Sequence, residues 1–170
     1  VTVRGGTLRR PQLPPAPDTS GLPHPVLPAL GQPWSILAAG IGGSGVVTVG
    51  ALLGMAAHVD GLGVTVLDVT GLAQKGGAVA SHVRIARTQD ELHAVHIEPG
   101  GADALLVADL LVAAGPEMRK RIEPGRTRAV VNLAETPTGA FTTNPDLPYP
   151  GQAAESRLRT APGGEPLARH

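Results

Sequence analysis

The stretch Trp34-Ser-Ile-Leu-Ala-Ala-Gly-Ile-Gly-Gly-Ser-Gly45 decides how the rest of the chain is arranged. It opens with an apolar run of strand length, residues 35–39, and then spaces Gly40, Gly42 and Gly45 as G-x-G-x-x-G. A long apolar segment, residues 46–59, follows at once. This order predicts a strand, a tight glycine turn and a helix that packs closely on the strand.

The same turn is a candidate site for an anion. The first N–H groups of a helix lack backbone partners, and the positive end of the helix dipole lies beside them. A glycine without a Cβ also lets a phosphate approach the backbone. The alternative is that the glycines serve only the packing of the turn.

Composition limits the class of protein. With 170 residues we expect one domain, and a net charge of zero without a basic stripe argues against nucleic acid as a partner. The absence of cysteine excludes disulfides, a cysteine nucleophile and a cysteine-ligated iron–sulfur cluster within this chain. The longest apolar stretch, residues 46–57, is too short to span a bilayer, and no apolar leader segment follows the N-terminal arginines. We expect a cytoplasmic protein that does not bind membranes and, because it starts with Val1, a fragment or a processed piece.

Three segments differ in character along the chain. Residues 1–33 hold eight of the 17 prolines, which predicts a proline-rich linker without helix or sheet. Residues 34–150 carry the apolar patterns of a folded domain. Residues 151–170 show no periodic apolar pattern, so we expect a disordered tail.

The folded part reads as an α/β domain. We expect strands at 35–39, 64–68, 79–86, 92–97, 109–114 and 127–133, and helices at 43–59, 101–108 and 116–122. Alternation over 79–86 with a partner strand at 92–97 predicts an inserted hairpin. The fold class is therefore a Rossmann-like three-layer domain with a largely parallel sheet and one inserted hairpin.

The helix predicted at 43–59 is apolar on every face. Helical spacing places Val46, Val49, Leu53 and Ala56 on one side, yet further apolar residues occupy the other sides. Little of this helix can face water, so we expect it to be covered on both sides, by the rest of the fold or by a partner.

Several other polar residues are candidates for a binding or metal site. Asp68 ends the second strand about 20 residues after the glycine turn, where dinucleotide-binding folds hold a ribose, although an Asp at a strand end also caps turns. The loop around Lys75, Gly76 and Gly77 suits a phosphate or carboxylate, or is a solvated turn. His93 and His96 lie three apart on a predicted strand and point to opposite sides, so we expect no metal site.

Several stretches together resemble the γ domain of 2-oxoacid:ferredoxin oxidoreductases. The resemblance rests on residues 40–58 and 66–85, the latter containing Gly71-Leu-Ala-Gln-Lys-Gly-Gly77, and it runs from about Trp34 to Leu147. With Asp109-Leu-Leu-Val-Ala-Ala114 and Arg128-Ala-Val-Val-Asn132, the chain is most similar to the indolepyruvate-specific branch. The proline-rich lead resembles the linker before this domain in long single-chain members.

The resemblance implies a part in the coenzyme A-dependent oxidative decarboxylation of an arylpyruvate. Thiamine diphosphate and iron–sulfur clusters serve the complete enzyme, the partners are thiamine diphosphate-binding and ferredoxin-like domains or subunits, and ferredoxin accepts the electrons. The chain lacks the Gly-Asp-Gly and paired asparagines typical of thiamine diphosphate sites, and it lacks cysteine. We therefore expect it to hold none of these cofactors alone and to be inactive by itself.

The resemblance also selects the candidate site. It assigns a cofactor or substrate surface to two glycine loops, with no residue acting as acid or base. The residues are Gly40, Gly42, Gly43, Ser44, Gly45, Lys75, Gly76 and Gly77. Two other functions stay open: a free-standing dinucleotide-binding module, and a structural assembly domain without a ligand.

Overall fold

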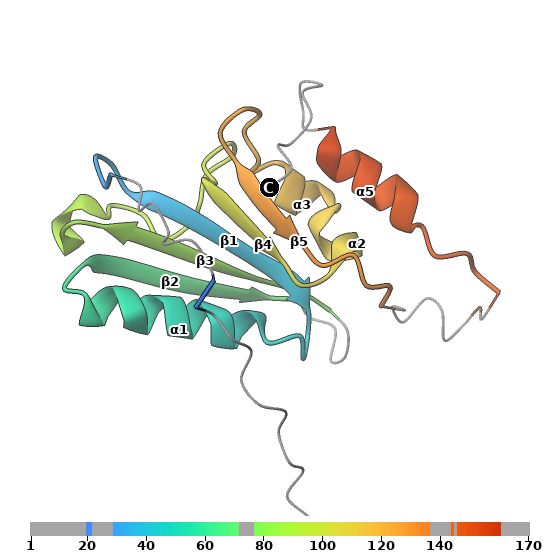
Figure 1. Ribbon diagram of the computed structural model, residues 1–170, viewed down its shortest axis with the longest axis horizontal. Coiled ribbons are helices and arrows are strands. Elements are labelled where there is room, and N and C mark those ends of the chain that lie inside the picture. Colours follow the sequence, from blue (N-terminus) through green and yellow to red (C-terminus); the bar gives the residue numbers. More distant parts are fainter. Residues whose placement is uncertain (1–19, 22–28, 72–76, 137–143, 145, 161–170) are drawn as a thin grey trace, which may run out of the picture.

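A five-stranded sheet forms the centre of the molecule in the computed structural model, which describes residues 20–21, 29–71, 77–136, 144 and 146–160 (Figure 1). The strands are β1 (Trp34–Ile41), β2 (Gly63–Thr70), β3 (Ala78–Ala86), β4 (Ala104–Val107) and β5 (Arg128–Val131), in the order β2-β3-β1-β4-β5. Pairing is antiparallel on both sides of β3 and parallel between β1, β4 and β5. Four strands therefore run in one direction and β3 alone runs against them.

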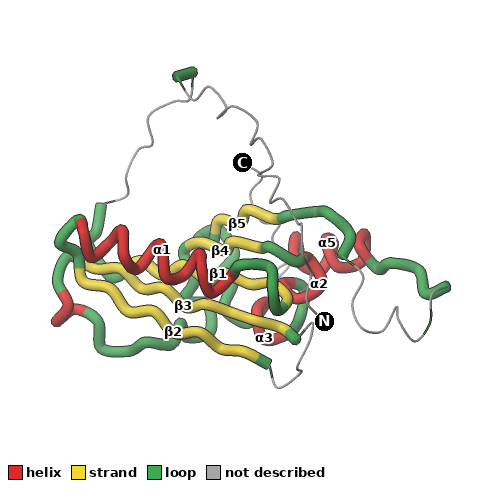
Figure 2. Tube along the Cα trace, turned by 90° about the horizontal axis from the view of Figure 1, so that it is seen from below, coloured by secondary structure: helices red, strands yellow, loops and turns green. Residues whose placement is uncertain are grey.

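Helices cover both faces of the sheet, which confirms the three-layer α/β class. Helix α1 (Val46–Val59) lies on one face, against β1, β2 and β3 (Figures 1 and 2). The other face carries α2 (Leu110–Ala113), α3 (Pro116–Arg119) and α5 (Gly151–Arg159). A short 3-10 turn, η1 (Gln89–Glu91), follows β3.

The core divides into two clusters because successive strand residues point to opposite faces. Leu37 belongs to the larger cluster, with Leu105 and Leu110, whereas its neighbour Ala38 packs with Val46 beneath α1. The larger cluster also contains Ala154 and Leu158 of α5.

Helix α5 corrects the prediction of a disordered tail from residue 151. Ala154 and Leu158, four residues apart, are 4% and 3% exposed and pack into the core. Two buried apolar residues on an otherwise polar segment are too few to give a recognisable helical period in the sequence. The helix is stabilised by its tertiary packing. Residues 161–170 lie outside the described residues, as does most of the predicted linker at 1–33.

The predicted hairpin is misplaced. The structure has no strand at 92–97, and the antiparallel partners of β3 are β2 and β1. The hairpin is the one formed by β2 and β3. The alternation predicted for β3 implies one buried and one solvent-exposed face. Residues 79–83 are instead buried on both faces of the sheet.

The helix predicted at 101–108 and the strand predicted at 109–114 are also wrong, and the two types are exchanged. Residues 104–107 pair with β1 on one side and β5 on the other, which makes this short apolar run a strand. Asp109 then begins α2, because its Oδ1 accepts the N–H of Val112 at 2.9 Å. An Asp before an apolar run is a recognised helix start, and here that cue outweighs the apolar character of the segment.

Helix α1 meets the sheet through small residues, and not through the face predicted from apolar spacing. Its buried residues are Val46, Gly50, Gly54 and Ala57. A Cβ on Gly50 would lie 2.0 Å from Ser81 Oγ, and one on Gly54 would lie 2.7 Å from Val66 Cγ2. The two glycines therefore let the helix approach the sheet more closely than alanine would. Within the described part of the chain, no helix is long and apolar enough to cross a membrane.

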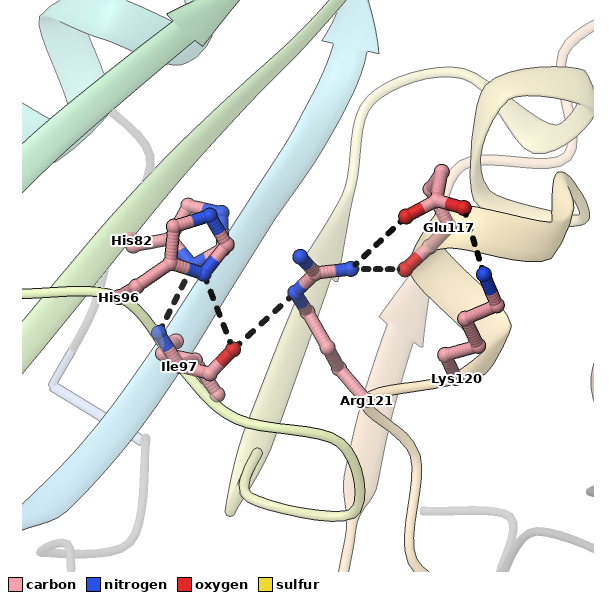
Figure 3. A network of polar contacts seen from close by, with 6 residues as sticks. All are labelled: His82, His96, Ile97, Glu117, Lys120 and Arg121. Carbon is pink, nitrogen blue, oxygen red and sulfur yellow. Dashed lines mark hydrogen bonds and ion pairs between the residues drawn. The ribbon is translucent and has the colours of Figure 1, made fainter.

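Loop 92–97 is held against β3 by a polar network (Figure 3). His82, 1% exposed, accepts the N–H of Ile97 on Nδ1 at 3.2 Å. The Ile97 carbonyl accepts from Arg121 Nε, and the His96 ring contacts the His82 ring at a tilt of 51° with centroids 4.2 Å apart. Burial lowers the pKa of His82 to about 4, and His96 and Arg121 contribute to the same direction.

We predict that replacing Gly50 with alanine destabilises the protein by about 1–3 kcal/mol because of overpacking. The same change at an exposed helix position stabilises a protein by about 1 kcal/mol. Denaturant unfolding measures the difference. In a Ser81→Ala background the loss should shrink, because the atom 2.0 Å from the added methyl group is gone. An equal loss in both backgrounds would contradict this packing.

We predict that acid destabilises the protein through His82. The unfolded chain takes up a proton near pH 6.5, whereas the folded His82 resists protonation until about pH 4. The free energy of unfolding is therefore unaffected by this group above pH 6.5. It falls between pH 6.5 and 4, by up to about 3 kcal/mol.

Urea unfolding across that pH range tests the prediction. The fall in the free energy of unfolding between pH 6.5 and 4 should be smaller in His82→Asn. It should be retained in the control His93→Asn, which changes an exposed histidine of the loop that packs on β3. Parallel pH profiles in the two variants would show that the decrease has another source.

Candidate functional site

The predicted glycine turn joins β1 to α1. Gly43 and Gly45 have φ of 92° and 84°, values that L side chains rarely adopt, so both positions need glycine. Gly40 serves packing, since a Cβ there would lie 2.5 Å from Ser44 Oγ. Gly45 is the N-cap of α1 and offers no capping side chain, and the first turn holds no acidic residue. The positive end of this helix is therefore not neutralised locally.

The structure brings the second glycine loop to the first. The N–H of Gly42 donates to the carbonyl of Gly77 at 2.9 Å, next to the pairing of Ile41 with Ala78. The two predicted loops therefore meet at Gly42 and Gly77. Lys75 and Gly76 lie outside the described residues.

An open pocket of about 440 Å³ lies at the glycine turn. Gly42, Gly43 and Ser44 form one side, with Ile41 beside them, and Ala108, Asn132 and Thr136 form the other. These residues follow β1, β4 and β5, three strands that run in the same direction. The pocket therefore occupies the carboxyl edge of a parallel sheet, where open α/β folds bind ligands.

The residues after β4 and β5 are site residues that we did not predict. Asn132 is fixed by its backbone, which donates to Val107, and by its side-chain amide, which donates to Ala108 at 3.2 Å. Parallel strands end at a common edge of the sheet, and this rule could have indicated these residues. It could not be applied from the sequence because residues 104–107 were predicted to be part of a helix.

Asp68 does not occupy the position of a ribose-binding residue. Strand β3 lies between β1 and β2, so the strand that carries Asp68 is not adjacent to the glycine turn. Asp68 is instead an exposed residue beside α1, where its Oδ1 is 3.5 Å from the position of a Cβ on Gly50. This strand order removes the observation that favoured a dinucleotide module.

The described lining of the pocket offers no group for acid–base chemistry. Among the residues that the structure describes, those that line the pocket carry no carboxylate, imidazole or amine. Ser44, the one hydroxyl in the turn, donates to the carbonyl of Ile41 at 2.6 Å, which occupies its proton. Among the described residues, no three histidine or acidic side chains gather as a metal site would require.

The model of the family described as Pyruvate ferredoxin/flavodoxin oxidoreductase matches residues 35–160. Indolepyruvate oxidoreductase subunit IorB of Methanothermobacter thermautotrophicus is 30% identical over 119 residues, which cover 69% of this chain and 56% of that protein. The subunit of the same name from Archaeoglobus fulgidus is 36% identical over 75 residues, covering 44% of this chain and 35% of that protein. The chain thus spans about half of the length of the first relative.

Solved structures share the fold at low sequence identity. The 2-oxoglutarate:ferredoxin oxidoreductase of Magnetococcus marinus, solved with 2-oxoglutarate, coenzyme A and succinyl-CoA bound, matches with a TM-score of 0.51 and 17% identity, over 76% of this chain and 24% of that one. Pyruvate oxidoreductase subunit PORC of Thermotoga maritima matches with a TM-score of 0.47 and 19% identity, over 65% of this chain and 54% of that one. Because the family model covers residues 35–160, the chain belongs to the pyruvate ferredoxin/flavodoxin oxidoreductase family.

Proposed function

We propose that this chain is the γ-type domain of an indolepyruvate ferredoxin oxidoreductase. In this role it contributes to the coenzyme A-dependent oxidative decarboxylation of an arylpyruvate. The relatives named indolepyruvate oxidoreductase subunit support the choice of 2-oxoacid. The chain works with thiamine diphosphate-binding and ferredoxin-like domains or subunits, with ferredoxin as the electron acceptor, and is inactive alone.

The pocket at the meeting of the two glycine loops carries the proposal. It joins the unneutralised N-terminus of α1 to the backbone of Gly42 and Gly43, and the described residues that line it include no acidic side chain that would repel an anion. We assign it to a phosphate group of coenzyme A, held by the loop residues Gly40–Gly45 and Gly77, with Lys75 and Gly76 of the second loop.

The other cofactors of the complete enzyme do not fit this chain. A chain without cysteine cannot ligate an iron–sulfur cluster through thiolates. The diphosphate–metal group of thiamine diphosphate requires oxygen ligands for a cation, and no carboxylate is present among the described residues that line the pocket. We therefore assign those cofactors to the partner domains or subunits. This chain binds and orients coenzyme A and performs no proton transfer.

We predict that coenzyme A stabilises the isolated chain against thermal unfolding, whereas NAD and thiamine diphosphate do not. A ligand at 100 times its dissociation constant raises the free energy of unfolding by about 2.7 kcal/mol. Differential scanning fluorimetry with each ligand measures the shift. Stabilisation by NAD alone would contradict the proposal and favour a dinucleotide module, and no shift with any ligand would favour a structural assembly domain.

A matched pair of variants locates the site. Gly43→Asp adds a carboxylate to the pocket and should abolish the shift caused by coenzyme A. Gly61→Asp is the control, because Gly61 also has a positive φ, 74°, and also faces open space, but it lies at the far end of α1. If both variants kept the shift, coenzyme A would bind elsewhere on the chain.

A further inference from the structure

The strand ends at the glycine-turn pocket carry backbone carbonyls. Ile41 is the last residue of β1 and Ala108 follows the last residue of β4, and both line the pocket. A carbonyl at the end of a strand lies where the hydrogen-bond ladder of the sheet stops, and its partial negative charge repels an anion. The partners of these carbonyls therefore decide whether the pocket attracts or repels a phosphate.

The carbonyl of Ile41 accepts two hydrogen bonds from Ser44. The backbone N–H of Ser44 donates at 3.0 Å and closes the turn, and Oγ of the same residue donates at 2.6 Å. A carbonyl oxygen has two lone pairs, so both are engaged here. The carbonyl of Gly77 is occupied as well, because it accepts the N–H of Gly42 at 2.9 Å.

The carbonyl of Ala108 is occupied by the side chain of Asn132. Nδ2 of Asn132 donates to it at 3.2 Å, and Oδ1 accepts the N–H of Ala134 at 3.0 Å. The two ends of the amide thus have partners of opposite kind, which fixes the orientation of the amide. Asn132 itself lines the pocket, so this bond is made at the wall where a ligand would lie.

Backbone donors of the turn remain available. Among the residues that the structure describes, the N–H groups of Gly43 and Gly45 have no acceptor. Gly43 lines the pocket, and Gly45 is the N-cap of α1. Occupied carbonyls beside free N–H groups are what an anion site requires.

We infer that Ser44 and Asn132 set the preference of this pocket for anions by occupying the strand-end carbonyls of Ile41 and Ala108. Both are positioning residues, because each acts through a backbone carbonyl. The inference deepens the proposed function and rests on it in one respect, that the pocket binds an anion. It holds for a phosphate group of coenzyme A and equally for inorganic pyrophosphate.

Isothermal titration calorimetry of the full chain with pyrophosphate and with coenzyme A tests the role of Asn132. Asn132→Ala removes the donor to Ala108 without adding charge, so both anions should bind about fivefold more weakly, the worth of one typical hydrogen bond. Asn144→Ala is the matched control. Oδ1 of Asn144 also accepts the N–H two residues on, that of Asp146 at 3.2 Å, but Asn144 does not line the pocket. This control should bind both anions as the wild type does.

A conservative pair of variants tests Ser44. Ser44→Ala leaves the Ile41 carbonyl with one donor and should also bind about fivefold more weakly. Ser44→Thr keeps the hydroxyl and should restore the affinity, which separates loss of the donor from general disturbance of the turn. Circular dichroism should be unchanged in all four single variants.

The double variant Ser44→Ala/Asn132→Ala completes the experiment. Two carbonyls that repel the same anion independently give losses that multiply, so we expect binding about 25-fold weaker than that of the wild type. A double variant no weaker than either single one would overturn the inference, since one general distortion of the pocket would then explain both losses.

The two ligands separate this inference from the proposed function. If the wild type and the single variants bound coenzyme A equally well, the inference would be wrong and the proposed function would stand. If the variants lost affinity for pyrophosphate while the wild type did not bind coenzyme A, the inference would be supported and the proposed function contradicted. A wild-type chain that bound neither anion would overturn both.

Discussion

The position of β3 is the constraint on which the rest of the structure depends. By running antiparallel between β1 and β2, it moves β2 to the edge of the sheet, and its first residue, Ala78, pairs with Ile41 beside the glycine turn. The hydrogen bond from Gly42 to Gly77 follows directly from this pairing. The same strand supplies Ser81, against which Gly50 of α1 packs. The order of the strands, the packing of α1 on the sheet and the contact between the two glycine loops therefore all depend on the position of β3.

The pocket is assembled from the ends of strands and contains little reactive chemistry. Backbone groups of the turn, the N-terminus of α1 and the amide of Asn132 surround it, and Asn132 is itself held by Val107 and Ala108. Such a lining offers hydrogen-bond donors to an anionic group and, among the described residues, no side chain for proton transfer. This division agrees with a family whose members act as oxidoreductases and with relatives that are named as subunits.

The buried polar groups hold loops, not ligands. His82 accepts from Ile97, whose carbonyl is held by Arg121, and this fixes loop 92–97 where a strand was predicted. Burial lowers the pKa of His82 because it disfavours the charged ring, and His96 and Arg121 act in the same direction. The neutral ring can accept the N–H of Ile97. The contacts of His82 therefore make it a structural residue, although a histidine beside a second histidine and an arginine resembles a functional cluster.

Turn glycines and short apolar runs depend only on residues that are neighbours in the sequence. Such local patterns by themselves determined the βα unit, the strands β2, β3 and β5, the helix at Pro116 and the two glycine loops. The structure decided the partners of β3, the exchange of strand and helix at 104–113, and α5, because each depends on contacts between residues far apart in the chain. Asn132 and Ala108 entered the site for the same reason: strand ends become neighbours only when the sheet has formed. The apolar character of α1 follows from its composition. The groove beside it, lined by Val46, Val49, Leu106 and Val130, exists only in the tertiary structure, because β4 and β5 pair beyond the reach of that helix.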